Sequence, residues 1–349
     1  MVTIREVAKK ADVSTATVSH VINNTRLVNA DTRQRVMLAM EETGYSPNYL
    51  AQSLRRGKTY TIGLVLPNLI DMSAAELGRA IEAAAFEKGY SVILGITDRN
   101  PSKELACIEI LRNKHVDGLI VACPGWNDPD VVNMLQNRNP PVVLVDREFV
   151  NFDGGVVTSQ NRQGSFNATQ HLIGLGHRRI ACLTGPSQMF DQLGNQREKG
   201  YRIALQEANI PVDENLIIEG DFRPETGRWA IQSLLALSEP PTAIFVCNDM
   251  MAFGVLKGAA ESGYFVPTDL AVVSFDDIEL APYMTPSLTS VSIPRVDMAL
   301  IAVQLLIDHL ESKADINQKI YLPTDLIIRD SCGGLQVNGD VAAGRTTKT

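Results

Sequence analysis

The sequence has 349 residues, of which 45% are hydrophobic, so the chain can bury the cores of two or three domains and is not intrinsically disordered. No apolar stretch reaches the ~18 residues of a membrane span, and charged residues near the N-terminus stand where a secretion signal needs apolar ones. We therefore expect a cytoplasmic protein without a membrane partner.

Residues 1–60 hold nine Lys and Arg against five acidic residues, a net charge of +4, whereas the whole chain carries −8. This division favours a polyanion bound by the N-terminal end alone.

Three short helices are predicted in the first 46 residues. Thr3 and Glu6 form a capping box ahead of apolar residues that recur at helical spacing. Ser14 is placed to cap a second helix over residues 14–23. A third helix begins at residue 31 and ends at Gly44, a residue type favoured just past a helix C-terminus.

The second of these helices turns a small, hydrogen-bonding face outward. This face consists of Thr15, Ala16, Ser19, His20 and Asn23. A helix, a short turn and a second helix with such a face is the helix-turn-helix arrangement, in which the second helix enters the major groove of DNA. Short polar side chains there suit a close approach to base edges and phosphates. An ordinary three-helix mini-domain with a polar surface is the alternative that the pattern leaves open.

Residues 47–57 predict a hinge helix that is too short to be stable alone. Pro47 begins the segment and Gly57 ends it, below the ~12–15 residues that an isolated helix needs. An apolar stripe that includes Leu54 lies beside Arg55. Such a stripe can pair with a twin copy and insert an apolar wedge into the minor groove, with arginine on the phosphates. A frayed linker helix is the alternative.

The body begins at Thr61, where short apolar runs start to alternate with helical stretches. Two series of runs read as buried strands: 62–66, 92–96, 118–122 and 142–145, then 180–184, 216–219, 243–247 and 271–275. This alternation predicts parallel, doubly wound sheets, and two similar sheets predict two lobes with a cleft. The expected α/β chain consists of a helix-turn-helix headpiece at 1–46, a hinge at 47–60, a two-lobed body at 61–332 and a tail at 333–349.

Polar side chains follow several of these strands at their carboxyl ends, where ligands of doubly wound sheets bind. They include Asp98, Asp146, Asn248 and Asp276. Each one alone is more often the cap of the following helix. Several facing one crevice favour a ligand rich in hydroxyls or amides, because carboxylates and amides supply directional acceptors and donors.

Three segments at the N-terminal end resemble the headpiece and hinge of the lactose/purine/ribose repressor family of bacterial transcription regulators, with the purine and ribose members most similar. They are Val13–Asn23, Gly44–Asn48 and Ala51–Arg55. The resemblance implies base-reading positions at Thr15, Ala16 and His20, phosphate-side or supporting positions at Ser14, Thr17, Ser19, Asn23 and Tyr45, and a minor-groove wedge at Leu54 beside Arg55. Ala16 stands where close relatives commonly have threonine, so the resemblance does not fix the base preference there.

The resemblance continues through the body, in the segments Leu175–Ala181, Asn248–Gly254 and Phe275–Ala281, and implies lobes like those of periplasmic sugar-binding proteins. It implies that Arg197 grips an effector and that Phe222 stacks on it. It also makes Asn248 and Asp276 partners of hydroxyls or ring nitrogens, with Asp146 as a further candidate. A surface ion pair at Arg197 and a core position at Phe222 are the alternatives.

This chain departs from the family where relatives usually have aromatic residues after the first strand of the body. It has Asp71-Met72-Ser73-Ala74 there, so one stacking face is missing. The loop over residues 187–193 is also longer than in close relatives. A sugar or sugar derivative is therefore favoured over a purine as the effector.

Two other classes of function were compared with a regulator. No catalytic motif supports an enzymatic function, because the sequence lacks a phosphate loop, a His-Glu-x-x-His motif and a Gly-x-Ser-x-Gly elbow. The five cysteines are scattered without metal-ligand or redox spacing, so we expect no metal and no cofactor. The headpiece counts against a free-standing solute-binding protein. We expect a sequence-specific repressor of double-stranded operator DNA that acts as a homodimer, since one short helix reads too few bases and the tail lacks the leucine heptads of a tetramerising coil.

Overall fold

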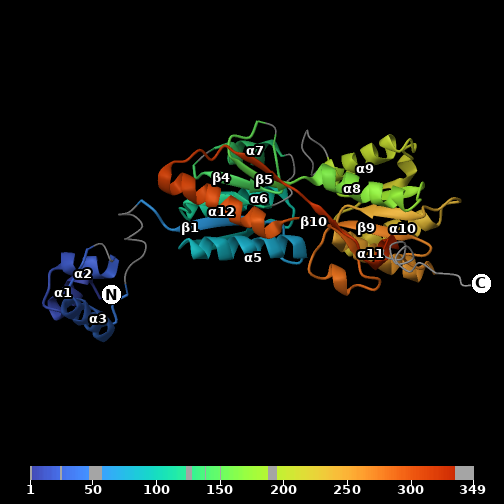
Figure 1. Cartoon of the computed structure of the whole chain (residues 1–349). Coiled ribbons are helices and arrows are strands. Elements are labelled where there is room, and N and C mark those ends of the chain that lie inside the picture. The colour runs from blue at the N-terminus through green and yellow to red at the C-terminus, as the bar shows by residue number, and fades with distance from the viewer. Residues whose placement is uncertain are drawn as a thin grey trace, which may run out of the picture. The chain divides into compact units, whose positions relative to one another are not determined.

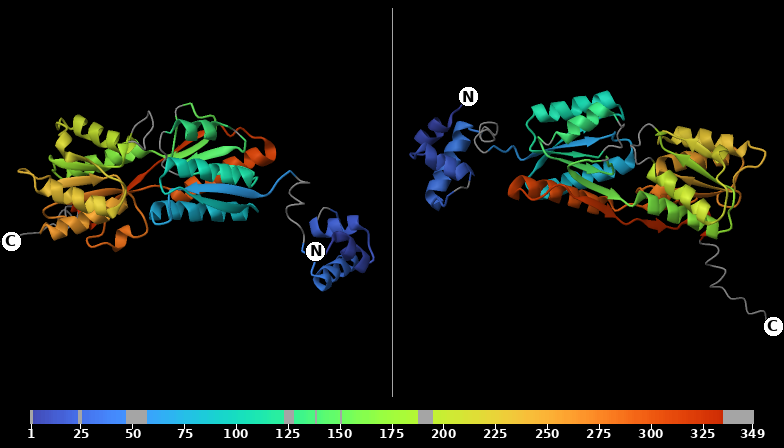
Figure 2. Two further views of the ribbon diagram at one scale, coloured as in Figure 1. Left: turned by 180° about the vertical axis from the view of Figure 1, so that it is seen from behind. Right: turned by 90° about the horizontal axis from the view of Figure 1, so that it is seen from above.

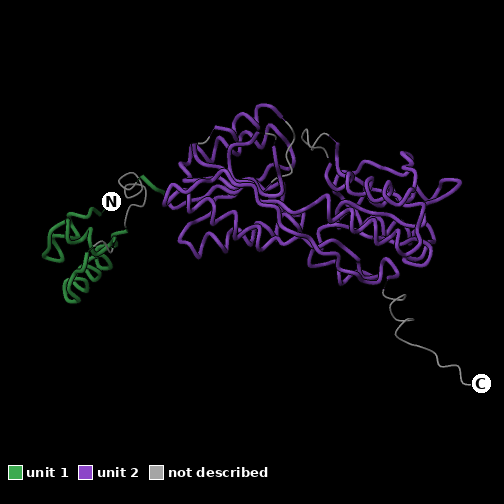
Figure 3. Tube along the Cα trace, turned by 45° about the horizontal axis from the view of Figure 1, so that its top comes forward, with its two compact units in different colours: residues 1–59 green, residues 60–349 purple. Residues whose placement is uncertain are grey.

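The computed structural model describes residues 2–23, 26–46, 57–122, 128–137, 139–149, 151–187 and 195–334. The chain divides into two compact units, Met1–Thr59 and Tyr60–Thr349, which we call the headpiece and the body (Figure 3). The hinge helix expected from residue 47 lies outside the described residues, apart from Gly57. No helix within the described ranges is long and apolar enough to cross a membrane.

The headpiece consists of α1 (Ile4–Lys10), α2 (Thr15–Asn23) and α3 (Ala30–Thr43) (Figure 1). The capping box of α1 is formed, with the N–H of Thr3 donating to Glu6 Oε2 at 2.6 Å. Gly44 ends α3 in the left-handed conformation with φ of 64°. The buried side chains beneath the helices are those of Val7, Ala8, Ala11, Val18, Val21, Val36 and Ala39. Larger side chains, among them Ile22, Met40 and Tyr45, pack against this cluster and are partly buried. The three predicted helices are therefore present, and small apolar side chains bring them together.

The first lobe of the body contains a six-stranded sheet in the order β11-β5-β4-β3-β1-β2, parallel throughout. Its strands are β1 (Thr61–Leu66), β2 (Ser91–Ile96), β3 (Gly118–Val121), β4 (Val142–Val145), β5 (Gly155–Ser159) and β11 (Lys319–Leu322). The helices α5 (Met72–Glu87) and α12 (Arg295–Ser312) pack on one face, and α6 (Pro101–Asn113) and α7 (Pro129–Gln136) pack on the other. Each face is buried under its own apolar cluster, as parallel sheets require.

The second lobe contains a sheet in the order β12-β10-β9-β8-β6-β7, in which β12 alone runs antiparallel. Its strands are β6 (Ile180–Thr184), β7 (Ile217–Glu219), β8 (Ala243–Val246), β9 (Ala271–Asp276), β10 (Thr289–Ser292) and β12 (Asp325–Ile327). Figure 1 shows α8 (Asn161–Gly174) and α9 (Gln196–Glu207) on one side, and α10 (Pro224–Leu235) and α11 (Asp249–Glu261) on the other. One continuous cluster, with Tyr201, Phe245 and Phe275 at its centre, fills this lobe.

The chain passes between the lobes three times. It leaves the first lobe between β5 and α8, returns between β10 and α12, and leaves again between β11 and β12. Figure 2 shows the two layered lobes joined by these segments from two further directions. Each lobe is therefore built from separate stretches of sequence, and the three connections form the hinge about which the lobes can turn.

The prediction of two doubly wound lobes is confirmed, and all eight predicted strands are present. The sequence reading did not identify four strands and two helices: β5, β10, β11, β12, α8 and α12. β10, α12, β11 and β12 lie after the point where the second predicted series ends, and β5 and α8 bridge the two series. All six belong to the segments that tie the lobes together.

Candidate functional site

The outer surface of the headpiece has the geometry expected of a reading helix. Ser14 Oγ accepts the N–H of Thr17 at 3.0 Å, so it caps the start of α2. Thr15 and Ala16 are exposed at this N-terminal end, while Val18 is fully buried beneath them. A helix N-terminus carries a partial positive charge and free N–H groups, which favour phosphate contacts.

The remaining candidates of the headpiece lie further along α2 or below it. Ser19 and His20 are half-buried, and the amide nitrogen of Asn23 donates to Ser19 O at 2.7 Å and to Ser19 Oγ at 3.1 Å. Tyr45 packs against the apolar cluster, which is a supporting position. Leu54 and Arg55 lie outside the described residues, so the wedge remains a prediction.

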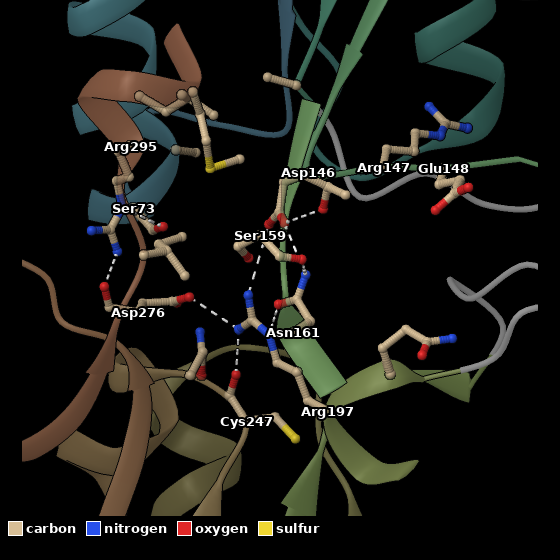
Figure 4. A pocket seen from close by; sticks show the side chains of 18 of the residues that line it. Ser73, Asp146, Arg147, Glu148, Ser159, Asn161, Arg197, Cys247, Asp276 and Arg295 are labelled. Carbon is tan, nitrogen blue, oxygen red and sulfur yellow. Dashed lines mark hydrogen bonds and ion pairs between the residues drawn. The ribbon is translucent and has the colours of Figure 1, made fainter. Parts of the chain in front are cut away.

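The body contains a cleft between its lobes, with a cavity of about 930 Å³. Residues of the first lobe and residues of the second lobe both line it, and most of its named side chains are polar or charged (Figure 4). All five predicted effector residues, Asp146, Arg197, Phe222, Asn248 and Asp276, line this one cavity. Its volume lies in the range of small-molecule sites.

Arg197, near the N-terminus of α9, is the centre of the cleft's polar network. Its Nε donates to Asn161 Oδ1 at 2.8 Å, and one terminal nitrogen donates to Cys247 O at 2.6 Å and to Asp276 Oδ1 at 3.0 Å. The other terminal nitrogen lies 3.7 Å from an oxygen of Asp146, which belongs to the first lobe. The guanidinium therefore joins a carboxylate of each lobe.

The electrostatics of this network depend on burial. Burial raises the pKa of Asp276 to about 7, although Arg197 and Arg295 both act to lower it. Burial acts to lower the pKa of Arg197, but Asp276 and Asp146 outweigh it and the pKa is raised. Asp276 also holds a φ of 112°, a backbone conformation that L side chains rarely adopt. Strain and burial concentrated at one carboxyl group are typical of a binding site.

Asp146 and Asn248 differ in how much of each side chain is left for a ligand. Asp146 Oδ1 accepts long hydrogen bonds from Thr158 at 3.4 Å and Asn161 at 3.3 Å, so its carboxylate is only weakly engaged. Asn248 Oδ1 accepts the N–H of Met251 and caps α11, as the helix-cap alternative predicts. A ligand can therefore use the amide nitrogen of Asn248 and the second lone pair of its oxygen.

Phe222 lines the cleft, but an arginine lies over its ring. The ring packs on the backbone of Gly185, where an added Cβ would lie 2.1 Å from a ring carbon. The guanidinium of Arg99, from the first lobe, stands 5.4 Å from the ring centroid and pairs with Asp71 at 2.6 Å. A flat ligand would have to displace Arg99 to stack on this ring.

Several residues of the site were missed by the sequence reading. Arg295, the first residue of α12, donates to Ser73 Oγ at 3.0 Å and to the backbone oxygen of Asp276, and lies 3.6 Å from Glu76. Glu76 in turn accepts the N–H of Glu279 from the second lobe at 2.9 Å. Both elements that supply Asn161 and Arg295 begin directly after a crossing between lobes. Two features of the sequence could have predicted these elements: the apolar run 155–157, which precedes Asn161, and the proline at 294, which is typical of a helix start at Arg295.

Within the described ranges, no group of three or more His, Cys, Asp or Glu side chains is arranged to hold a metal ion. The cleft offers carboxylates, amides and guanidinium groups, and the carboxylate of Asp146 accepts only long hydrogen bonds from Thr158 and Asn161. This donor and acceptor set can bind and orient a small polar molecule.

Comparison with known proteins gives matches to both units. The family described as "Bacterial regulatory proteins, lacI family" matches residues 3–48, and the "Periplasmic binding protein-like domain" matches residues 169–332. An "HTH-type transcriptional repressor PurR" from Erwinia tasmaniensis is 39% identical over 332 residues, which cover 95% of this chain and 97% of that protein. The protein of the same name from Klebsiella pneumoniae is 38% identical over 334 residues, with the same coverage.

Solved structures show the same likeness. The Lac repressor dimer bound to operator and the anti-inducer ONPF superimposes with a TM-score of 0.84 at 28% identity, covering 95% of this chain and 98% of that one. A transcriptional regulator CelR–cellobiose complex gives a TM-score of 0.72 at 31% identity, covering 95% and 100%. Each of these likenesses extends over the headpiece and the body together.

Proposed function

Since the chain belongs to the lacI family and is a DNA-binding transcriptional repressor, not an enzyme, we propose that a hydroxyl-rich, sugar-like effector bound between its lobes controls it. The observation that carries this proposal is the Arg197 network, which holds a carboxylate of each lobe beside the cavity. Hydroxyl groups of a ligand donate to Asp146 and Asp276 at once, and so draw the lobes together.

A purine is the competing effector, because the relatives at 38–39% identity carry the name PurR. A planar ring needs a flat slot with two apolar faces. In this cleft, Phe222 offers one apolar face, over which Arg99 lies. The segment after β1, where relatives usually have aromatic residues, contributes Ser73 and Ala74 to the lining. These residues favour a ligand with out-of-plane hydroxyls. The CelR–cellobiose complex, similar over the whole body, also supports a carbohydrate.

The effector acts on DNA binding through the hinge between the lobes. A ligand that binds the closed arrangement of the lobes more tightly than the open one shifts the population toward the closed arrangement. The three segments that cross between the lobes then turn together. This turn changes the separation of the two headpieces in a dimer. By linkage, operator DNA changes effector affinity by the same factor that effector changes operator affinity.

A homodimer places two headpieces on a near-palindromic operator. The edge strand β2 supports pairing through the body, because it has one neighbour in the sheet and leaves Ile93 and Leu94 about 40% exposed. An exposed apolar edge strand is a ready pairing surface. Light scattering of purified protein tests this, and Leu94→Glu should lower the dimer fraction if β2 lies in the interface.

The experiment that tests the function has two stages. Selection from a random duplex library yields the preferred operator, and fluorescence anisotropy then measures its affinity as salt is raised, where a steep fall is expected. Thr15→Ala on the reading face should weaken specific binding by about tenfold. Gln34→Ala, exposed on α3, is the matched control and should leave it unchanged.

The second stage adds candidate effectors. A melting-temperature screen against sugars, sugar phosphates and purines should show selective stabilisation by a carbohydrate, because a ligand bound to the native state raises its stability. Operator affinity is then measured with and without that ligand. Stabilisation by a purine alone would reject the sugar-like effector, and failure to prefer any duplex over random competitor would reject the repressor.

A further inference from the structure

Two side-chain donor groups that line the cleft have no hydrogen-bond partner within the described residues. Ser159 is 3% exposed, and its Oγ bonds to nothing in the described part of the chain. The amide nitrogen of Asn195, the N-cap of α9, is also buried and without a partner there. Leaving a buried polar group unsatisfied costs about 1–3 kcal/mol. Both line the cavity, and Figure 4 shows Ser159 beside Asp146 and Asn161.

The first turn of α8 supplies free backbone donors at the same place. α8 is 14 residues long, and the side chain of its N-cap Gln160 makes no capping hydrogen bond. Gly164 N–H donates to Gln160 O, whereas the N–H groups of Arg162 and Gln163 donate no hydrogen bond among the described contacts. Residues 159–163 all line the cleft. The dipole of a helix this long adds positive potential at its N-terminus, which favours a bound anion.

The side chains that line the cavity as a whole are more often basic than acidic. The side chains that line the cavity include six basic and four acidic ones. Arg162 is exposed at the rim and has no ion pair within the described ranges. The nearby carboxylate of Asp146 is offset by Arg197 at 3.7 Å. A group with several acceptor oxygens and a negative charge would satisfy Ser159, Asn195 and the helix turn together.

We propose that the first turn of α8, with Ser159, Asn195 and Arg162 around it, is a subsite for a phosphoryl group, and that the effector is therefore a phosphorylated sugar. The inference rests on the proposed function, because it names the chemical class of the ligand in the same cleft. The carboxylates Asp146 and Asp276 accept the hydroxyls of the sugar, while the α8 turn receives its phosphoryl oxygens. The hydroxyl-binding and phosphoryl-binding residues lie side by side, because Asn161 in the α8 turn donates to Asp146 at 3.3 Å.

The test measures binding of inorganic phosphate to the full chain. Phosphate is titrated at constant ionic strength with chloride as the balancing anion, and the melting temperature of the body gives the half-saturating concentration. Ser159→Ala and Arg162→Gln should each raise this concentration about tenfold, the effect of one lost hydrogen bond to a charged group. Lys257→Gln removes one exposed charge of α11 in the same lobe, outside the cleft, and should change nothing.

A matched ligand pair tests the assignment with sugars. Glucose and glucose 6-phosphate differ only in the phosphoryl group, as do ribose and ribose 5-phosphate. Phosphorylated members should stabilise the wild-type protein more than neutral ones, and Ser159→Ala should reduce the stabilisation by phosphorylated members more than the stabilisation by neutral ones. Arg162→Gln changes an exposed side chain, so it remains informative if the Ser159 variant folds poorly.

Three results would overturn the subsite. Equal phosphate binding by wild type and both variants would mean an adventitious ion only. Stabilisation by neutral sugars without any effect of phosphate would reject the subsite but keep the proposed function. A failure of neutral sugars, sugar phosphates and phosphate alike to stabilise the wild-type body would reject both.

Discussion

The headpiece and the body bury their side chains on different scales and turn their functional residues in opposite directions. The buried headpiece core consists of seven valine and alanine residues, whereas the clusters of both lobes of the body contain buried tyrosine or phenylalanine side chains. The headpiece carries its candidate residues on the outside of α2, and the body carries them inside a cleft. A small core leaves little stability in reserve. The comparison teaches that the two functions depend on separate structures and should be separable by substitution.

The largest effect is expected from removing the headpiece. A chain that begins at residue 58 keeps both sheets of the body, so its melting and its effector affinity should match the full chain. Specific operator affinity should fall by at least about 10³-fold, the usual ratio of specific to nonspecific binding. Anisotropy with the selected operator measures operator affinity, and calorimetry with the effector measures effector affinity. Operator binding that survives the truncation would contradict the division.

Next in size is the loss of the buried guanidinium. Arg197→Met leaves Asp276 and Asp146 without their partner, and breaking a buried ion pair costs about 3–5 kcal/mol. The body should melt at a lower temperature and effector affinity should fall by more than 100-fold, about 3 kcal/mol. The double variant Arg197→Met, Asp276→Asn should recover part of the stability because no charge is left unpaired at Asp276. Headpiece melting should stay unchanged in both.

A matched pair of core truncations compares the two units directly. Val18→Ala and Val246→Ala remove the same atoms from fully buried sites in α2 and β8. Each should cost about 2 kcal/mol in its own unit. Val18→Ala should also weaken operator binding, because the smaller core tolerates the loss less well. If Val246→Ala weakened operator binding as much as Val18→Ala does, as measured by anisotropy, the headpiece and the body would not be independent.

The smallest expected effect is a difference in pH dependence. Burial raises the pKa of Asp249 to about 6, even though Ser274, Ser290 and the N–H of Ile278 all donate to it. Its contribution to body stability is full below its usual value of 3.8 and is lost as pH rises toward 6. Hydrogen bonds from Thr3 lower the pKa of Glu6, so its contribution to the headpiece is present at neutral pH and is lost in acid.

Variants isolate these opposite slopes. Asp249→Asn should flatten the stability of the body between about pH 4 and pH 6, relative to wild type. Glu6→Gln should lower headpiece stability at pH 7 and have less effect near pH 3. Thermal unfolding followed across this range, with the two transitions resolved, is the measurement. If the contributions of Asp249 and Glu6 to stability changed with pH in the same direction, the opposite pKa shifts given to these two residues would be contradicted.

The sequence supported prediction wherever a feature depends on neighbours along the chain. The capping box at Thr3, the cap at Ser14 and the C-terminal Gly44 were found because helix signals are local. The strands that alternate with helices were found for the same reason. β11 and β12 were not predicted because they are short, partly exposed edge strands, with only three and two consecutive apolar residues within their bounds.

The candidate site was predictable at the strand ends and not elsewhere. Asp146 and Asp276 follow predicted strands, so the sheet geometry placed them together in advance. Arg99 over Phe222 could not be foreseen, because the two come from different lobes and meet only in three dimensions. The same holds for Arg295, which reaches Ser73 across 222 positions of sequence.

The three crossings between the lobes have a consequence for the order in which the protein is made. The three helices of the headpiece and Tyr45, which packs against their core, are made early, whereas the first lobe waits for α12 and for β11, which ends at Leu322. Until then the sheet face that α12 covers stays open, with buried partners such as Val143 and Ile120 exposed. A nascent or prematurely terminated chain therefore presents a finished DNA-reading unit on an unfinished sensor, and regulation by the cleft begins only when synthesis is nearly over.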